Sequence, residues 1–231
     1  MCGRFALVLT AGRFARTFGC PAPAGDERRF NITPDRPVTV VRAETGAGGR
    51  RALHMRWGLV PPWSRDPADK GRQINARSET MFEKRTFADA ARHRRCLIPA
   101  SGFYEWQKPV DGGRAAGKQP FWIGRIDGEP MAFAGICNDA TPGCAILTME
   151  ARPSLAAIHH RMPVMLDAAA WNAWLDPDRT DPEAISASLR PIAEDRLTAW
   201  PVSRAVNDPR NDDESLRTPI DPPKPAQPSL F

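Results

Sequence analysis

Short stretches in which apolar and polar residues alternate, or in which β-branched and aromatic residues run together, recur along the whole chain. Runs of this kind, four to eight residues long and bounded by turn residues, are typical of β-strands. They predict strands at 5–8, 38–41, 54–60, 96–99, 102–107, 121–126, 131–137, 145–149, 164–166 and 197–203. The pattern therefore favours a fold built mainly from short strands.

Apolar residues with helical spacing are confined to short segments, which predict helices at 10–18, 78–95, 154–160, 168–175 and 181–189. Thr10 is a suitable N-cap for the first of these, and Gly19 a suitable stop. The strands do not alternate with helices in a βαβ rhythm, and no glycine-rich dinucleotide fingerprint is present. We therefore predict an α+β fold, with a mainly antiparallel β core and short flanking helices in one domain, residues 1–220. The proline-rich residues 221–231 predict a disordered tail.

Composition narrows the class of protein. The 231 residues contain no run of about 20 apolar residues, so no transmembrane helix is expected. The chain begins without a basic segment followed by an apolar one, so no signal peptide is expected and the cytoplasm is the predicted compartment. The five cysteines are odd in number and lack a C-x-x-C pair, and the four histidines lack metal-ligand spacing. We predict neither a metal nor a cofactor.

The net charge of +5 is unevenly distributed. Residues 1–125 hold 23 Lys and Arg against 11 Asp and Glu, whereas residues 126–231 hold 9 against 16. Of the 32 basic residues, 27 are arginines, which bind phosphate in a bidentate way. A basic half rich in arginine favours a polyanionic partner, although codon bias in a GC-rich genome explains the arginine content equally well.

The chain begins Met1-Cys2-Gly3-Arg4-Phe5. Removal of Met1, which a small second residue permits, would leave Cys2 with a free α-amine and a thiol on adjacent carbons. Their ordinary pKa values are about 7.7–8.0 and about 8.5, so both are partly reactive near neutral pH. An amine and a thiol so placed can capture an aldehyde as a five-membered thiazolidine ring. Taken alone, the same pentapeptide also fits a cysteine that is merely a small buried apolar residue.

Four further stretches change that balance: Asn75-Ala76-Arg77-Ser78-Glu79-Thr80, then 95–106 (RCLIPASGFYEW), then 158–166 (IHHRMPVML), and Ala205-Val206-Asn207. Together with the first five residues, and in this order, they resemble the SRAP family of SOS response-associated peptidases. The resemblance runs from residue 2 to about residue 215. Five matching segments with compatible spacing are far more specific than one short motif.

The resemblance implies an SRAP-like fold and an abasic site processing function in the DNA damage response. Members bind single-stranded DNA and form a covalent thiazolidine cross-link with the ring-opened abasic sugar. By the same resemblance Cys2 is the nucleophile, and Asn75 holds the N-terminal cysteine and the sugar. Glu105 is the acid/base that shuttles protons, and His160 assists ring opening and reversal, with the adjacent His159 as the other candidate ring. The family is further linked to removal of its own Met1, hence the protease label, and to a lyase-like release of the sugar.

Residues for DNA binding follow from the same motifs. Arg4, Arg77 and Arg161 resemble the family's phosphate-binding arginines, and Trp63 and Trp106 are candidates for stacking on bases. The implied partner is single-stranded DNA that contains abasic sites. The protein is predicted to act as a monomer, associated with the nucleoid.

Two alternatives and one separate hypothesis stay open. Cys2 and His160 would also suit a cysteine hydrolase, and the arginines and tryptophans would suit a noncovalent reader of single-stranded DNA. In the tail, Gln227, Leu230 and Phe231 belong to a peptide that resembles the Gln-x-x-Leu-Phe motifs that dock on the bacterial replication sliding clamp. A chance match is the other explanation of a pattern this short.

Overall fold

The computed structural model describes residues 2–24, 28–44, 48–61, 63–64, 71–109 and 117–221. The strands within these ranges are β1 (Phe5–Leu7), β2 (Arg29–Ile32), β3 (Pro37–Ala43), β4 (Arg50–Trp57), β5 (Asn75–Arg77), β6 (Arg95–Ala100), β7 (Gly102–Gln107), β8 (Gln119–Arg125), β9 (Met131–Asn138), β10 (Gly143–Glu150), β11 (Arg161–Pro163), β12 (Met165–Leu166) and β13 (Leu197–Pro201). The α-helices are α1 (Ala11–Phe18), α2 (Ala88–His93), α3 (Pro153–Ala156), α4 (Trp171–Leu175) and α5 (Pro182–Ser188). Single 3-10 turns are η1 (Ser78–Thr80), η3 (Ala168–Ala170), η4 (Glu194–Arg196), η5 (Arg204–Asn207) and η6 (Glu214–Arg217).

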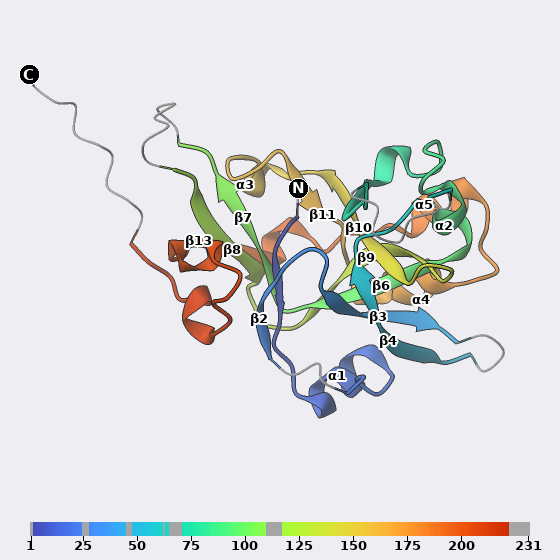
Figure 1. Ribbon diagram of the computed structural model, residues 1–231, viewed down its shortest axis with the longest axis horizontal. Helices are drawn as coiled ribbons and strands as arrows, with labels where there is room; N and C mark the ends of the chain where they lie inside the picture. The colour runs from blue at the N-terminus through green and yellow to red at the C-terminus, as the bar shows by residue number, and fades with distance from the viewer. Residues whose placement is uncertain are drawn as a thin grey trace, which may run out of the picture.

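Two sheets form the body of the protein (Figure 1). The five-stranded sheet has the order β13-β8-β7-β1-β2, and all its neighbours are antiparallel. The eight-stranded sheet has the order β11-β10-β4-β3-β6-β9-β12, with β5 beside β10. A further pairing of β9 with β10 closes the path β10-β4-β3-β6-β9 on itself, and closure removes the exposed strand edges there. The α+β prediction with a mainly antiparallel core is confirmed; the parallel pairs are those of β10 with β4 and with β5.

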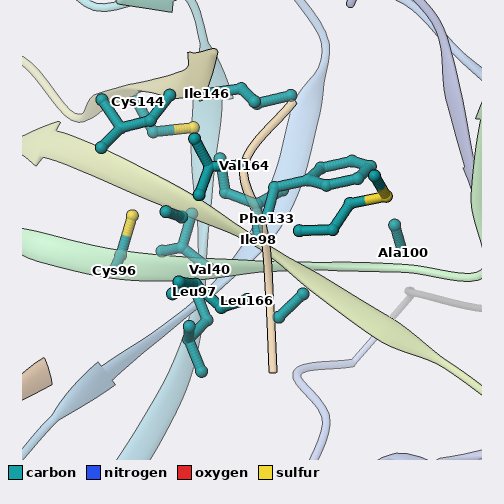
Figure 2. Close-up of a cluster of buried hydrophobic side chains, with 14 of the residues drawn as sticks. Val40, Cys96, Leu97, Ile98, Ala100, Phe133, Cys144, Ile146, Val164 and Leu166 are labelled. Carbon is teal, nitrogen blue, oxygen red and sulfur yellow. The ribbon is translucent and has the colours of Figure 1, made fainter. Parts of the chain in front are cut away.

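The main hydrophobic core fills the closed part of the eight-stranded sheet (Figure 2). It continues under the five-stranded sheet. Leu97, Ile98, Phe133 and Ile146 have no solvent exposure. Phe5 joins the two sheets, because its ring packs edge-on against Trp57 and Phe133 with centroids 5.1 and 5.7 Å away. Strand β1 is thereby anchored in the core at its first residue, three positions after Cys2.

The five-stranded sheet has a second, smaller core on its other face. Tyr104 and Trp122 meet there at a ring-centroid distance of 5.0 Å, and Val206 and Leu216 of the C-terminal 3-10 turns cover them. Successive side chains of a strand point to opposite faces. In β7, Phe103 therefore faces the main core, Tyr104 the second core, and Glu105 again the main-core side.

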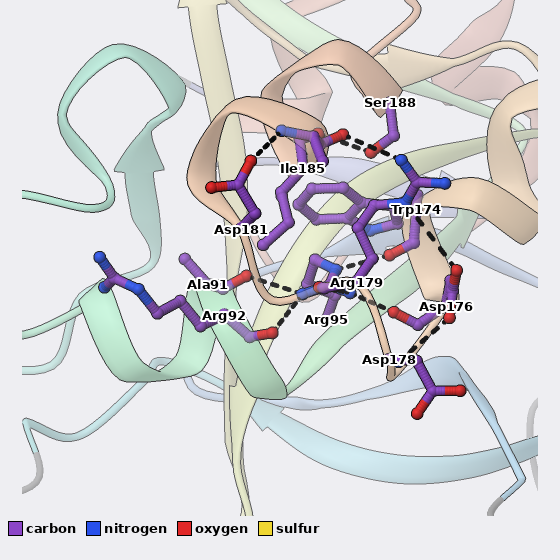
Figure 3. Close-up of polar contacts among 11 residues, drawn as sticks. Ala91, Arg92, Arg95, Trp174, Asp176, Asp178, Arg179, Asp181, Ile185 and Ser188 are labelled. Carbon is purple, nitrogen blue, oxygen red and sulfur yellow. Dashed lines mark hydrogen bonds and ion pairs between the residues drawn. The ribbon is translucent and has the colours of Figure 1, made fainter.

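Arg95 is the most buried arginine of the described residues and fastens α4 and the loop after it to α2 (Figure 3). Its guanidinium donates to five backbone carbonyl oxygens, those of Ala91, Arg92, Trp174, Asp176 and Arg179. Burial lowers the pKa of Arg95 to about 10, so it stays positively charged at neutral pH. None of these acceptors is a carboxylate, and the charge is instead spread over peptide dipoles.

Several sequence predictions were wrong in detail. The helix predicted over 78–95 is an α-helix only at Ala88–His93, because η1 and turns occupy the preceding residues, where the Ser78 hydroxyl donates to the Thr148 carbonyl at 3.1 Å. Helix α3 ends at Ala156 rather than at residue 160. Strands β2, β5 and β11 were not predicted.

The predicted caps of the first helix were confirmed. The Thr10 hydroxyl accepts from the backbone N–H of Arg13, and Gly19 ends α1 with a φ of 72° in the left-handed region. None of the helices in the described ranges is long and apolar enough to cross a membrane. The tail from residue 222 onward lies outside the described residues.

Candidate active site at the amino terminus

Cys2 lies just before β1 and is completely buried. The side-chain amide of Asn75 donates to its backbone carbonyl at 2.9 Å. Burial is the main reason that the pKa of the Cys2 thiol is raised well above its ordinary value, and the negative charge of Glu105 adds to the rise. The thiol is thus protonated at neutral pH, and a carboxylate lies close enough to influence it.

Glu105 is 6% exposed, which is unusual for a carboxylate. Its position follows from the register of β1 and β7: Phe5 pairs with Phe103, and the backbone N–H of Tyr104 donates to the carbonyl of Arg4 at 2.9 Å. One step further along the same ladder, Glu105 comes opposite Gly3. Burial raises the pKa of Glu105, and the positive charge of the amino terminus opposes that rise. A raised pKa makes this carboxyl group a better proton acceptor than an ordinary glutamate, as a general acid/base requires.

Asn75 is the first residue of β5, which runs parallel to β10. Its partner in β10 is Ile146. This pairing brings the Asn75–Thr80 motif to the amino terminus across 73 positions of the chain. Its Nδ2 is used by the Cys2 carbonyl, whereas its Oδ1 is buried and has no hydrogen-bond partner among the described residues. An unsatisfied buried acceptor costs about 1–3 kcal/mol and is rare in proteins. The Asn75 oxygen is therefore an acceptor held ready for a donor beside Cys2.

His159 and His160 follow α3, and their rings stack with centroids 4.3 Å apart. His159 is half-buried, whereas His160 is exposed. The pKa of His159 is lowered by burial, and then by the positive charge of the amino terminus. The same charge acts on Glu105, so His159 and Glu105 both lie within electrostatic range of the amino terminus.

The backbone of Arg161 holds the His159 ring. Its N–H donates to Nδ1 at 3.0 Å, and its carbonyl oxygen lies 3.1 Å from the same nitrogen. A neutral ring can accept from the N–H, and a protonated ring can donate to the carbonyl. The ring keeps one orientation in both protonation states and presents Nε2 away from the backbone, as a proton donor or acceptor needs to do.

The Arg161 side chain makes its contacts inside the protein. Nη1 and Nη2 donate to the two carboxylate oxygens of Glu79 at 2.7 and 2.9 Å, and Nη2 also donates to the Thr148 carbonyl at 2.7 Å. The hydrogen bond from Arg161 lowers the pKa of Glu79. Glu79 and Arg161 thus fix the turn that carries His159. Glu79 stood inside a recognised motif, but nothing in the sequence indicated its partner 82 positions away.

The other residues predicted for DNA binding fall into two groups. The Arg4 guanidinium lies inside the protein, where Nη1 donates to Asn31 Oδ1 at 2.7 Å and to the Val206 carbonyl at 2.6 Å. It also lies over the Trp106 ring at 5.8 Å, and Trp106 donates to Asn207 Oδ1 at 2.8 Å. By strand alternation Trp106 is on the face opposite to Glu105.

Arg77 and Trp63 are the exposed members of the predicted set. The Arg77 side chain is exposed and makes no hydrogen bond or ion pair with another described residue. Trp63 is 47% exposed, with the Arg85 guanidinium 4.9 Å from its ring centroid. The structure thus brings Cys2, Asn75, Glu105 and the histidine pair together, and it leaves Arg77 and Trp63 on the surface.

Comparison with known proteins connects this geometry to named relatives. The family model for SOS response associated peptidase (SRAP) matches residues 1–209. Abasic site processing protein YoqW of Bacillus subtilis is 34% identical over 226 residues, covering 94% of this chain and 98% of that protein. Abasic site processing protein YedK of Escherichia coli is 32% identical, covering 95% and 100%. Abasic site processing protein HMCES of chicken is 29% identical, covering 96% and 78%.

Solved structures give the same picture of the fold. A crystal structure of a protein from Bacteroides thetaiotaomicron matches with a TM-score of 0.79 at 21% identity, covering 95% of this chain and all of that one. One from Bordetella bronchiseptica matches with a TM-score of 0.73 at 28% identity, covering 87% of this chain and all of that one.

Proposed function

The chain belongs to the SOS response associated peptidase (SRAP) family, and on this premise we propose that it processes abasic sites in DNA as part of the response to DNA damage. The observation that carries the proposal is the meeting of Cys2, Asn75 and Glu105 at the beginning of β1. Loss of Met1 would place a free amine beside the thiol there. The names of the relatives, all abasic site processing proteins, agree with this chemistry.

The reaction is a covalent capture of the ring-opened abasic sugar in single-stranded DNA. The Cys2 amine attacks the aldehyde carbon, a C–N bond forms, and water leaves to give an imine. The thiol sulfur then adds to the imine carbon, and its proton passes to the imine nitrogen, closing the thiazolidine. Because burial keeps the thiol protonated, amine attack comes first and the thiol adds to an imine that is already formed.

Three side chains assist these steps. Glu105, with its raised pKa, takes a proton from the attacking group and returns it to the leaving water. The unsatisfied Oδ1 of Asn75 accepts a hydrogen bond from the Cys2 amine or a sugar hydroxyl. A histidine assists opening of the sugar ring and later reversal. We assign this role to His159, with His160 stacked on it, because His159 is the half-buried ring and the positive charge of the amino terminus contributes to its lowered pKa.

A denaturing gel tests the proposal. Purified protein, with loss of Met1 confirmed by intact mass, is mixed with a labelled single-stranded oligonucleotide that carries one abasic site. We expect a shifted band with the lesion that is absent with Cys2→Ala and absent without the lesion. A band that never forms, although Met1 is gone, overturns covalent capture and leaves the noncovalent reader. A shortened labelled strand would reveal the lyase-like activity.

The site offers little support for a general cysteine hydrolase. Such enzymes need a thiolate, which an adjacent imidazolium stabilises by lowering the thiol pKa. Here burial and Glu105 raise that pKa instead. We propose that peptidase activity is limited to removal of Met1. Synthesis in a cell-free system without methionine aminopeptidase tests this: retention of Met1 in the wild type would overturn it, and retention only in Cys2→Ala would support it.

Two proposals on partners remain. The peptide with Gln227, Leu230 and Phe231, which lies outside the described residues, is proposed to bind the replication sliding clamp. Equal clamp recovery by the full chain and by a chain lacking residues 227–231 would overturn this.

We also propose that the protein acts as a monomer associated with the nucleoid. Light scattering with and without DNA checks the monomeric state.

A further inference from the structure

A polar cleft of about 560 Å³ lies between β2, the β3–β4 hairpin and the C-terminal 3-10 turns, outside the amino-terminal site. Basic side chains dominate its lining: Arg29, Arg36, His54 and Arg210. The buried Asn31 and the exposed Asp212 also line it. Neither the cross-linking chemistry nor the residues predicted for DNA binding use this cleft.

The positive charge of the cleft is only partly compensated. Arg29 donates to the carbonyl of Pro37 at 2.5 Å, which leaves its charge without a carboxylate partner in the described ranges. Arg36 is exposed and makes no side-chain hydrogen bond or ion pair with another described residue. Arg210 is paired with Asp208 at 2.7 Å. Within the lining, three guanidinium groups thus face one carboxylate.

That carboxylate, Asp212, already accepts hydrogen bonds from the backbone. Asp212 Oδ1 accepts from the backbone N–H groups of Phe30 and Asn31 at 2.5 and 2.8 Å. It therefore fixes β2 against the C-terminal segment. An anion that enters the cleft therefore meets two arginines, Arg29 and Arg36, that have no carboxylate partner among the described residues.

The cleft is connected to the amino-terminal site through Asn31. Its Oδ1 accepts from Arg4, and its Nδ2 donates to the carbonyls of Val206, Asp208 and Asn211 at 3.3, 3.1 and 2.7 Å. Strand β2 pairs with β1 through Phe5 and Ile32, three residues after Cys2. With a rise of about 3.3 Å per residue, the cleft begins on the order of 10–15 Å from Cys2.

This spacing and charge suit a strand that runs on from the site. Arginine binds phosphodiesters through paired N–H groups, and such contacts hold the strand without reading its bases. The lining residues include no aromatic ring on which a base would stack, apart from the imidazole of His54. We propose that the cleft binds the phosphodiester backbone of the DNA strand on one side of the abasic nucleotide. The proposal rests on the proposed function, because it assumes that DNA occupies the Cys2 site.

The test compares two double variants that each remove two arginines. Arg29→Ala with Arg36→Ala empties the cleft of its uncompensated charge, and Arg16→Ala with Arg51→Ala removes two exposed arginines elsewhere as the matched control. Cross-linking rates at limiting protein are measured with a long single-stranded oligonucleotide and with a short one of about three nucleotides. A single Arg36→Glu variant repeats the test at a side chain without internal contacts.

We expect the cleft variants to slow capture of the long oligonucleotide by about 5–20-fold at low salt and to leave the short one within about twofold. The slope of log rate against log salt should fall by about 1.4, since each phosphate contact with a single strand contributes about 0.7. Oligonucleotides extended only on the 5′ or only on the 3′ side then identify the strand direction. The control double variant should stay within about twofold throughout.

Two results would overturn the proposal: an equal loss with both lengths, which would mean that the arginines shape the reaction site, or no loss with either. Noncovalent binding of an undamaged oligonucleotide by fluorescence anisotropy separates this outcome from failure of the proposed function. If the wild type forms no cross-link but its affinity still depends on Arg29 and Arg36, the cleft stands and the covalent mechanism falls.

Discussion

Two buried polar regions of this protein handle hydrogen bonding in opposite ways. Around Arg95, a buried cation finds five carbonyl acceptors from two segments about 80 positions apart (Figure 3). Around Cys2, a buried amide oxygen has no partner among the described residues, and two groups have pKa values raised by burial. The first arrangement is satisfied and holds the fold together. The second keeps its bonding capacity for something that is not yet bound, as functional sites commonly do.

The largest expected effect on stability is at the satisfied region. Arg95→Met leaves five buried carbonyls without their donor and should lower the free energy of unfolding by about 3–5 kcal/mol. For a protein of this size the melting temperature should fall by roughly 6–20 °C. Calorimetry measures this, and cross-linking at 10 °C should stay within about threefold of the wild type. The ammonium group of an Arg95→Lys variant reaches fewer of the carbonyls, so this variant should recover only part of the stability.

Glu105→Gln should have the opposite effects, a large loss of cross-linking rate and a gain in stability at pH 7. Loss of a general acid/base costs about 100-fold in the rate of cross-link formation. Stability should change the other way: because the pKa of Glu105 is raised in the folded state, the folded protein binds more protons than the unfolded one. The free energy of unfolding therefore falls as the pH rises from about 4.3 to the raised pKa.

The glutamine variant lacks this fall, so its melting temperature should exceed that of the wild type at pH 7 and match it near pH 4. Thermal scans at both pH values check this. A variant that is less stable at pH 7 would mean that Glu105 holds the fold, and the contrast between the two regions would be lost.

The next largest effect on the rate of cross-linking is expected at the histidine pair. His159→Ala should slow cross-linking or its reversal by about 10–30-fold, whereas His160→Ala, which removes only the stacked exposed ring, should cost less than about threefold. Single-turnover gels of both variants across pH 5–8 measure this. A larger loss for His160 would assign the role to the outer ring, as the family resemblance implied.

The smallest effect is expected at Glu79. Glu79→Gln weakens the hold on Arg161 and should slow the reaction by about 3–5-fold, because the turn that carries His159 becomes less well positioned. Since Glu79 acts through His159, the loss should vanish in a His159→Ala background. Additive losses in the double variant would show that Glu79 acts separately from the histidine.

The sequence allowed much of the fold to be predicted where local patterns decide it. Strands such as β7 and β9 follow from runs of aromatic and β-branched or apolar residues, and α1 follows from Thr10 and Gly19. The helix expected over 78–95 fails because a tertiary contact, from Ser78 to Thr148, overrides a plausible spacing of apolar residues. Strand β5 has three residues, too few for a periodic signal, and forms because β10 offers it a neighbour.

The candidate site likewise has features that the sequence predicted and features that it did not. Motif order selected Cys2, Asn75 and Glu105, and the first two are now seen to meet through a 2.9 Å hydrogen bond. The internal contacts of Arg4 and Arg161 were not predictable, because their partners, Asn31, Val206 and Glu79, lie 27 to 202 positions away. A contiguous motif such as Gly102–Trp106 also serves two faces of one sheet, and the sequence did not indicate which core each face would meet.

The place of β1 between β7 and β2 has a mechanical consequence. A DNA strand attached to residue 2 and put under tension by a passing motor would pull β1 along its own axis. Hydrogen bonds on both sides would then be loaded in shear, so that they resist together rather than opening one at a time. Phe5, whose ring packs against Trp57 and Phe133, further anchors β1 close to the point where the force is applied. The proposed cross-link would therefore join DNA to the protein at a point where the fold resists pulling.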